Sequence, residues 1–159
     1  MSRPLSAPVF RDARHEEVPA IVALLADDAL GRSREAFGAS APVDPAYAAA
    51  FEAIERDPNN RLIVADLEGE VAGCMQLTTI PHLTFKGGTR LQIEGVRVKE
   101  RFRSRKIGAA MIDWAIAVAR AESCHLVQLT CNRERGDARR FYESRGFTPT
   151  HVGFKLYLP

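Results

Sequence analysis

Three strand-forming runs follow one another through the middle of the chain, and this succession constrains the fold more than any other feature. The runs cover residues 62–65, 71–80 and 90–98, and residues 68–70 form a predicted tight turn between the first two. Runs connected this closely pair as antiparallel neighbours in one sheet. Because such a sheet must bury at least one face, the chain also has to supply helices that cover it.

A strand–helix–strand unit is predicted after these runs. Residues 107–121 carry apolar side chains at helical spacing and only two charged ones, Asp113 and Arg120, which predicts a helix that is nearly buried all round. Residues 126–130 predict a further strand. The crossover that leads to it from residues 90–98 should be right-handed, and the two strands should be parallel.

Further elements are predicted on both sides of this region. Helical patterns cover residues 16–29, 45–56 (with Asp44 as N-cap) and 137–145, residues 31–42 are loop-like, and residues 147–158 are strand-rich. The predicted fold class is therefore α/β (α+β). We expect a mixed, mostly antiparallel central sheet of about six to seven strands, flanked by about four helices, with one parallel strand pair.

Length and composition narrow the class of protein. A chain of 159 residues is typical of one domain, which we expect to span residues 1–159. The net charge of +2 is low for a nucleic-acid-binding protein, and no apolar run approaches the roughly 20 residues of a membrane span. Residues 1–10 lack an apolar stretch for a signal peptide. The three cysteines form no Cys-x-x-Cys pair, so neither a disulfide framework nor a metal site is indicated, and a cytoplasmic location is expected.

A basic turn between the third run and the long helix is the main candidate for a binding site. Six of the ten residues from Arg97 to Lys106 are basic, and Gly108, Ala109 and Ala110 follow directly. A helix start with small side chains exposes backbone N–H groups, which suits a phosphate. Neither a P-loop nor a dinucleotide-binding fingerprint is present. From these residues alone, a solvated basic turn before a core helix is an equally good interpretation.

This turn resembles the acyl-CoA signature of the GNAT superfamily of N-acyltransferases. The resemblance rests on Val98, Arg103, Lys106, Gly108 and Ala109 in their order and spacing, and the predicted order of elements is similar to the GNAT fold. It implies acetyl-CoA as co-substrate. The residues that the resemblance assigns to binding it are Val96, Val98, Arg103, Ser104, Arg105, Lys106, Ile107, Gly108, Ala109, Asn132 and Arg139.

A second block, in which Asn132 precedes Ala138, Tyr142 and Gly146–Phe147, is similar to the second GNAT motif. Two positions depart from the family pattern. Lys106 stands where glycine is usual, so the turn there is either less tight or needs a backbone that tolerates a left-handed conformation. Asn132 precedes Ala138 by six residues rather than three, which puts Arg135 in the usual position of the asparagine. The longer form resembles a branch that includes aminoalkylphosphonate acetyltransferases.

Two residues are candidates for catalysis. Tyr142 matches the family tyrosine that donates toward the sulfur of CoA, and the alternative is a tyrosine that only packs against Phe141 and Phe147. By period-2 alternation Glu94 shares a strand face with Val96 and Val98. A carboxylate there is a candidate general base, used directly or through water, or else one half of a buried ion pair with an arginine. Gly95 could allow a β-bulge that frees a backbone N–H for the acetyl carbonyl.

The resemblance implies an N-acetyltransferase that transfers the acetyl group of acetyl-CoA to a primary amine of a small molecule, by direct attack in a ternary complex. Alternatives are acetylation of a protein N-terminus or lysine, a non-catalytic acyl-CoA-binding sensor, and a module that binds nucleic acid through the basic turn. No nucleic-acid or membrane partner is expected, and the sequence leaves open whether the chain forms a homodimer. His82 and His151 could line the acceptor pocket or be ordinary histidines, and Cys131 is expected to be a packed small residue.

Overall fold

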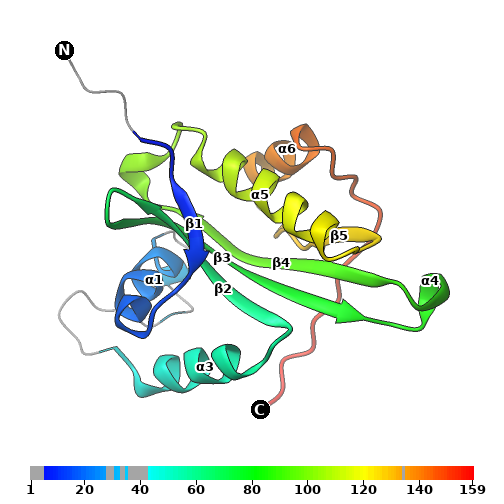
Figure 1. The fold of residues 1–159 in the computed structure, drawn as a ribbon, viewed down its shortest axis with the longest axis horizontal. Coiled ribbons are helices and arrows are strands. Elements are labelled where there is room, and N and C mark those ends of the chain that lie inside the picture. Colours follow the sequence, from blue (N-terminus) through cyan, green and yellow to red (C-terminus); the bar gives the residue numbers. More distant parts are fainter. Residues whose placement is uncertain (1–5, 28–30, 33–34, 36–42, 134) are drawn as a thin grey trace.

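The computed structural model describes residues 6–27, 31–32, 35, 43–133 and 135–159 (Figure 1). Its helices and strands occur along the chain in this order: β1 (Val9–Asp12), the 3₁₀ helix η1 (His15–Glu17), α1 (Val18–Leu25), α3 (Pro45–Arg56), β2 (Asn60–Leu67), β3 (Glu70–Pro81), α4 (Thr84–Gly87), β4 (Thr89–Val98), the 3₁₀ helix η2 (Glu100–Phe102), α5 (Ile107–Ala121), β5 (Leu126–Leu129) and α6 (Gly136–Ser144).

Five strands form one sheet in the order β1-β2-β3-β4-β5. Strands β1 to β4 pair with one another in antiparallel fashion, whereas β5 pairs with β4 in parallel. The turn between β2 and β3 places Glu68 and Gly69 at φ 55° and 85°, as a tight hairpin requires. The predicted hairpin order and the parallel pair are therefore confirmed.

The C-terminal segment departs from the prediction. Residues 147–158 were expected to be strand-rich, but residues 147–159 form neither helix nor strand in the structure. An alternating pattern makes a segment suitable for a sheet, but a strand also needs a neighbour for its N–H and C=O groups. This segment pairs with no strand of the described chain, so the sheet has five strands instead of six to seven.

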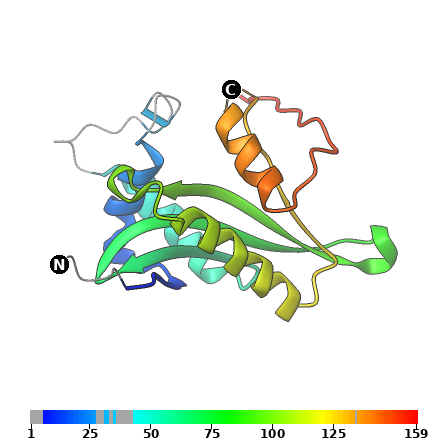
Figure 2. The ribbon, with the colours of Figure 1, turned by 90° about the horizontal axis from the view of Figure 1, so that it is seen from above.

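Two helical layers cover the sheet, with α5 and α6 on one side and α1 and α3 on the other (Figures 1 and 2). On the α5 side, Met75 and Ile93 of the sheet join the fully buried Met111 and Ile112. The prediction that α5 is nearly buried all round is wrong, because residues such as Ala117 and Arg120 on its outer side are exposed. None of the described helices is long and apolar enough to cross a membrane.

The four expected flanking helices correspond to α1, α3, α5 and α6. The bounds of α3 and α5 match the prediction, and Asp44 caps α3 by accepting a hydrogen bond of 2.8 Å from the backbone N–H of Ala46. The first helix begins as η1 before α1, and its predicted end at residue 29 lies outside the described residues, as does most of the predicted loop 31–42. The tip of the β3–β4 hairpin carries α4, a single turn in which Phe85 and Lys86 have left-handed backbone angles.

A β-bulge in β4 changes which side chains face the core. Cys74 lies opposite Arg97 while Gln76 lies opposite Glu94, so β4 contains one extra residue, at Gly95–Val96. Gly95 has φ +60°, which a glycine adopts without strain. Val96 and Val98 therefore pack on the α5 side of the sheet together with Ile93. The expectation that Glu94 shares their face is wrong, because the extra residue reverses the alternation.

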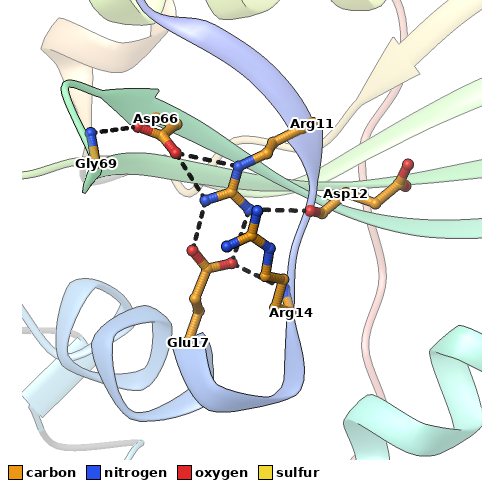
Figure 3. A network of polar contacts seen from close by, with 6 residues as sticks. All are labelled: Arg11, Asp12, Arg14, Glu17, Asp66 and Gly69. Atoms are coloured by element: carbon orange, nitrogen blue, oxygen red, sulfur yellow. Dashed lines mark hydrogen bonds and ion pairs between the residues drawn. The ribbon is translucent and has the colours of Figure 1, made fainter.

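A charged network attaches β1 to the rest of the molecule (Figure 3). The Arg11 guanidinium donates hydrogen bonds of 2.8 and 3.1 Å to Asp66 and of 2.6 and 2.9 Å to Glu17. Asp66 also accepts from the N–H of Gly69, and Glu17 accepts from the N–H of Arg14. Hydrogen bonds from Arg11 lower the pKa of both carboxyl groups. One side chain thus connects β1, the β2–β3 turn and the start of α1.

We expect Arg11→Ala to lower the free energy of unfolding by about 2 kcal/mol, because two half-buried carboxylates lose their charged hydrogen-bond donor. Urea denaturation at pH 7 measures this. Since the folded-state pKa values of Glu17 and Asp66 lie below their unfolded values, the stabilisation is complete at neutral pH and is lost as the pH falls below about 4. Arg56→Ala, which removes an exposed pair with Glu52, should change stability by less than about 0.5 kcal/mol. Equal effects of the two substitutions would contradict the assignment.

Candidate functional site

The parallel strands β4 and β5 pair only over the first part of β4. Their register ends with Ile93 opposite Leu129, whereas β4 continues to Val98 and the chain after β5 turns into α6. Ligands of open α/β sheets bind beyond the carboxyl ends of neighbouring parallel strands. We call the region formed by the end of β4, the start of α5 and the facing side of α6 the candidate site.

The basic turn enters α5 through two left-handed residues. Ser104 has φ 65° and Lys106, the residue before the helix, has φ 60°. The sequence departure at Lys106 therefore falls on a backbone conformation that favours glycine. In the part of the chain that the structure describes, no side chain caps α5, and its first helical bond runs from the N–H of Ala110 to the carbonyl of Lys106. The three N–H groups before Ala110 lack a helical acceptor and carry the positive end of the helix dipole, which suits an anion.

Gly108 lies where the three parts of the candidate site meet. A Cβ atom at this position would lie 3.6 Å from Cγ2 of Val98 and 3.7 Å from Cζ of Phe141. These are ordinary van der Waals distances, so a methyl group fits, but a branched side chain would press on β4 or α6 or fill the space in front of the helix. Glycine therefore keeps the start of α5 accessible.

Arg103 and Arg105 of the basic turn make different contacts. Arg103 donates 2.8 Å to Asp27 and 3.2 Å to the carbonyl of Val98, so it ties the end of β4 to the residues after α1. The Arg105 guanidinium lies over the ring of Phe102 at 5.2 Å, and Phe102 itself is buried in the core. Arg105 is exposed beside the start of α5, as is Lys106. Among the predicted phosphate contacts, Arg105 and Lys106 present exposed cations, whereas Arg103 is engaged by Asp27.

Tyr142 projects from α6 into an aromatic cluster. Its ring centroid lies 5.1 Å from that of Phe141 and 6.0 Å from that of Phe147. Burial raises the pKa of the phenol and the nearby Cys131 thiol raises it further, while Arg97 and Arg135 lower it. The hydroxyl therefore stays protonated at neutral pH and can donate a proton. Tyr142 therefore packs against Phe141 and Phe147, which was the alternative expectation, and can also donate a proton.

Glu94 is exposed on the side of the sheet away from α5, opposite Gln76 in β3. The alternative that it forms a buried pair with an arginine is wrong, because the residue is exposed and no arginine of the described chain bonds to it. Glu94 and Tyr142 come from different elements and share no hydrogen bond. An exposed carboxylate next to the bulge is accessible to a substrate or to water.

A row of neutral polar side chains beside Glu94 was missed in the sequence. Asn60, Thr78, Gln92 and Gln128 lie directly opposite one another on β2, β3, β4 and β5. The hydroxyl of Thr78 donates 2.7 Å to Asn60, and the amide of Gln128 donates 2.6 Å to Gln92. The sequence contained a signal for this polar row, because polar residues alternate with apolar ones in two of the predicted strands.

The remaining predicted residues divide between the candidate site and other places. Arg135 precedes α6, is half-buried and lies close enough to affect Tyr142, while Asn132 is exposed and its carbonyl accepts 3.0 Å from the N–H of Arg135. Arg139 pairs with Glu143 at 3.0 Å on the exposed side of α6. The charge of Arg135 thus affects the Tyr142 phenol, whereas Arg139 is engaged by Glu143.

Neither histidine singled out in the sequence lies at the candidate site. His82 is near the tip of the β3–β4 hairpin, where its ring packs against His125 and Phe85. This tip is at the opposite end of β4 from Val98, nine residues or roughly 30 Å along the strand. His151 lies in the exposed C-terminal segment.

Comparisons with known proteins identify the family of the chain and its fold. The model of the acetyltransferase (GNAT) family matches residues 23–147. The aminoalkylphosphonate N-acetyltransferase of Salmonella typhimurium is 33% identical over 109 residues, which cover 69% of this chain and 70% of that protein. A crystal structure of a transcriptional regulator from Bacillus halodurans C-125 superposes with a TM-score of 0.89 at 42% identity, over 95% of this chain and 99% of that one. Glucosamine-6-phosphate N-acetyltransferase from Arabidopsis thaliana has the same fold, with a TM-score of 0.76 at 19% identity over 97% of this chain and 100% of that one.

Proposed function

The chain belongs to the GNAT family of acetyltransferases, and from this premise we propose that it transfers the acetyl group of acetyl-CoA to the primary amine of a small molecule. One observation carries the proposal. The uncapped start of α5, the glycine at position 108 between β4 and α6, and the protonated hydroxyl of Tyr142 belong to one region at the end of β4. An anion-binding helix start next to a proton donor suits a phosphate-containing thioester.

In this proposal the pyrophosphate of acetyl-CoA binds the free N–H groups at the start of α5. The small side chains of Gly108 and Ala109 let phosphate oxygens approach the backbone, and Arg105 and Lys106 supply exposed positive charge. Val96 and Val98, at the end of β4, border the path toward the bulge. The thioester would then lie between the bulge and α6.

The reaction proceeds by direct attack in a ternary complex. The amine nitrogen attacks the thioester carbonyl carbon, the carbon–sulfur bond breaks, and the leaving thiolate takes a proton from the Tyr142 hydroxyl. Glu94 accepts the proton that the amine loses, directly or through a water molecule. The carbonyl oxygen accepts a hydrogen bond from a backbone N–H at the Gly95 bulge while negative charge develops on it.

The acceptor is proposed to be a small polar amine. The relative from Salmonella typhimurium is an aminoalkylphosphonate N-acetyltransferase, and the polar row of Asn60, Thr78, Gln92 and Gln128 beside Glu94 offers neutral hydrogen-bonding groups to such a molecule. The rival functions are peptide acetylation and acyl-CoA sensing without turnover. A third rival is nucleic-acid binding through the basic turn, which the net charge of +2 disfavours.

Release of CoA in the presence of a panel of acceptors tests the proposal. The panel contains aminoalkylphosphonates, amino sugars, amino acids, and peptides that carry a free N-terminus or a lysine. We expect turnover with at least one of the small primary amines and none with the peptides. Tight binding of acetyl-CoA without any turnover would favour the sensor. Salt-dependent binding of duplex DNA that acetyl-CoA does not affect would favour the third rival.

In the same assay, Tyr142→Phe should lower kcat on the order of 10²-fold and leave the affinity for acetyl-CoA nearly unchanged, because the ring still packs and only the hydroxyl is lost. Tyr157→Phe is the matched control, since Tyr157 is exposed in the C-terminal segment and should behave like the parent. Unchanged turnover of the Tyr142 variant would remove the proton-donor assignment.

Gly108→Val should weaken acetyl-CoA binding at least about tenfold in calorimetry, because the branched side chain reaches the space in front of the helix start. Ala117→Val, on the exposed side of the same helix, controls for the lower helix propensity of valine and should bind acetyl-CoA like the parent. Equal affinities of both variants would show that the start of α5 does not hold the phosphates.

Glu94→Gln tests the general base through the pH profile of kcat. The profile of the parent should rise with pH as a base loses its proton, and in the variant this ascending limb should move if Glu94 is that base. Binding of acetyl-CoA should not change. Glu55→Gln, at an exposed position of α3, should leave the profile as it is. A limb that stays in place in Glu94→Gln would assign it to the acceptor amine instead.

A further inference from the structure

A buried thiol in β3 faces the bulge of β4. Cys74 is 1% exposed and belongs to the apolar cluster on the α1 side of the sheet, together with Ile21, Leu24 and Val64. Its Sγ donates a hydrogen bond of 3.8 Å to the carbonyl oxygen of Gly95, the glycine of the bulge. Burial raises the pKa of this thiol to about 12, so it keeps its proton at every working pH and remains a donor.

The bulge needs such a contact because the regular pairing of β3 with β4 is interrupted there. One residue of β3 stands against two of β4, Gly95 and Val96, and neither of these has a partner in the register. The peptide groups of a bulge are therefore not oriented by the ladder alone. The carbonyl of Gly95 accepts from Cys74, and the carbonyl of Val96 accepts 2.9 Å from the guanidinium of Arg97. Side chains thus determine how both peptides are turned.

The direction of one N–H group follows from the contact with Cys74. The peptide between Gly95 and Val96 is trans, so its C=O and N–H groups point in opposite directions. Since the carbonyl points toward Cys74 in β3, the N–H of Val96 points away from β3. On that side of β4 the neighbouring strand has already ended, because the register of β5 stops at Leu129. The N–H of Val96 is therefore directed toward the candidate site.

We propose that Cys74 is a positioning residue for acetyl transfer, because its thiol holds the Gly95 carbonyl on the β3 side and so aims the N–H of Val96 at the thioester carbonyl oxygen. This inference rests on the proposed function, in which a backbone N–H at the bulge stabilises that oxygen. Such a donor is effective only when it is held in place before the charge develops. A thiol suits this position, since it donates a weak hydrogen bond and otherwise packs as a small apolar group.

The variant Cys74→Ala removes the donor and keeps a small apolar side chain. We expect kcat to fall at least about fivefold while the KM for acetyl-CoA stays within about twofold of the parent, because only the aim of a transition-state contact changes. The loss should be the same at every pH, since the thiol does not titrate in the working range, whereas Glu94→Gln should move the ascending limb. Cys74→Ser, whose hydroxyl can donate to the same carbonyl, should recover part of kcat.

Ile21→Val is the matched control, because it removes one methyl group from the same apolar cluster and leaves the bulge contact in place. It should have the kcat of the parent. The inference is wrong if Cys74→Ala keeps the kcat of the parent, if Ile21→Val loses as much, or if Cys74→Ser recovers nothing.

The amide signal of Val96 tests the orientation without turnover. In isotope-labelled parent protein, acetyl-CoA should shift the NMR signal of this N–H downfield relative to CoA, which lacks the acetyl carbonyl. The difference should disappear in Cys74→Ala and remain in Ile21→Val, and the same spectra show whether each variant is folded. A difference that persists in Cys74→Ala would overturn the inference.

The two measurements separate this inference from the proposed function. If the parent binds no acetyl-CoA and releases no CoA with any amine, the proposed function fails and the inference fails with it. If the parent is active and Cys74→Ala matches it in both kcat and the Val96 signal, only the role of Cys74 is wrong.

Discussion

The parallel pairing of β4 and β5 ends at Ile93 and Leu129, and the chemistry proposed for this molecule depends on that end point. Up to there the sheet is a continuous hydrogen-bonded layer between two layers of helices. Beyond it, the backbone of β4 continues without its parallel neighbour, and the two elements that follow the strands, α5 and α6, bring a helix start and a tyrosine to the same region. The bulge at Gly95 lies just past this point and frees backbone groups that a regular ladder would occupy.

The bulge also separates two kinds of surface on one strand. Before it, Ile93 faces the α5 core and Glu94 faces the other side; after it, Val96 and Val98 return to the core face. A single extra residue therefore lets β4 contribute an exposed carboxylate on one side of the sheet and an apolar border next to α5 on the other. The half-buried polar row that ends at Gln128 extends the side of Glu94 across four strands.

Stability and site geometry are connected through charged side chains at the margins of the sheet. Arg11 attaches β1 to the β2–β3 turn and to the start of α1, and Arg103 attaches the end of β4 to Asp27. Lys106 holds a left-handed conformation at a cost of about 1 kcal/mol, which the burial of α5 through Met111 and Ile112 offsets. A strained residue at the entry to a functional helix is tolerated because the surrounding packing determines its position.

Local patterns in the sequence determined much of the backbone. The hairpin order of the strands, the bounds of α3 and α5 and the Asp44 cap follow from interactions between residues close in the chain, so they could be predicted. The face on which Glu94 lies, the exposed outer side of α5, the Arg103–Asp27 pair and the unpaired C-terminal segment could not. Each depends on what a distant part of the chain does: whether a bulge reverses the alternation, whether another layer covers a helix, and whether a strand finds an edge. Only the tertiary structure decides these, because burial and pairing are relations between elements and no single element carries them in its own sequence.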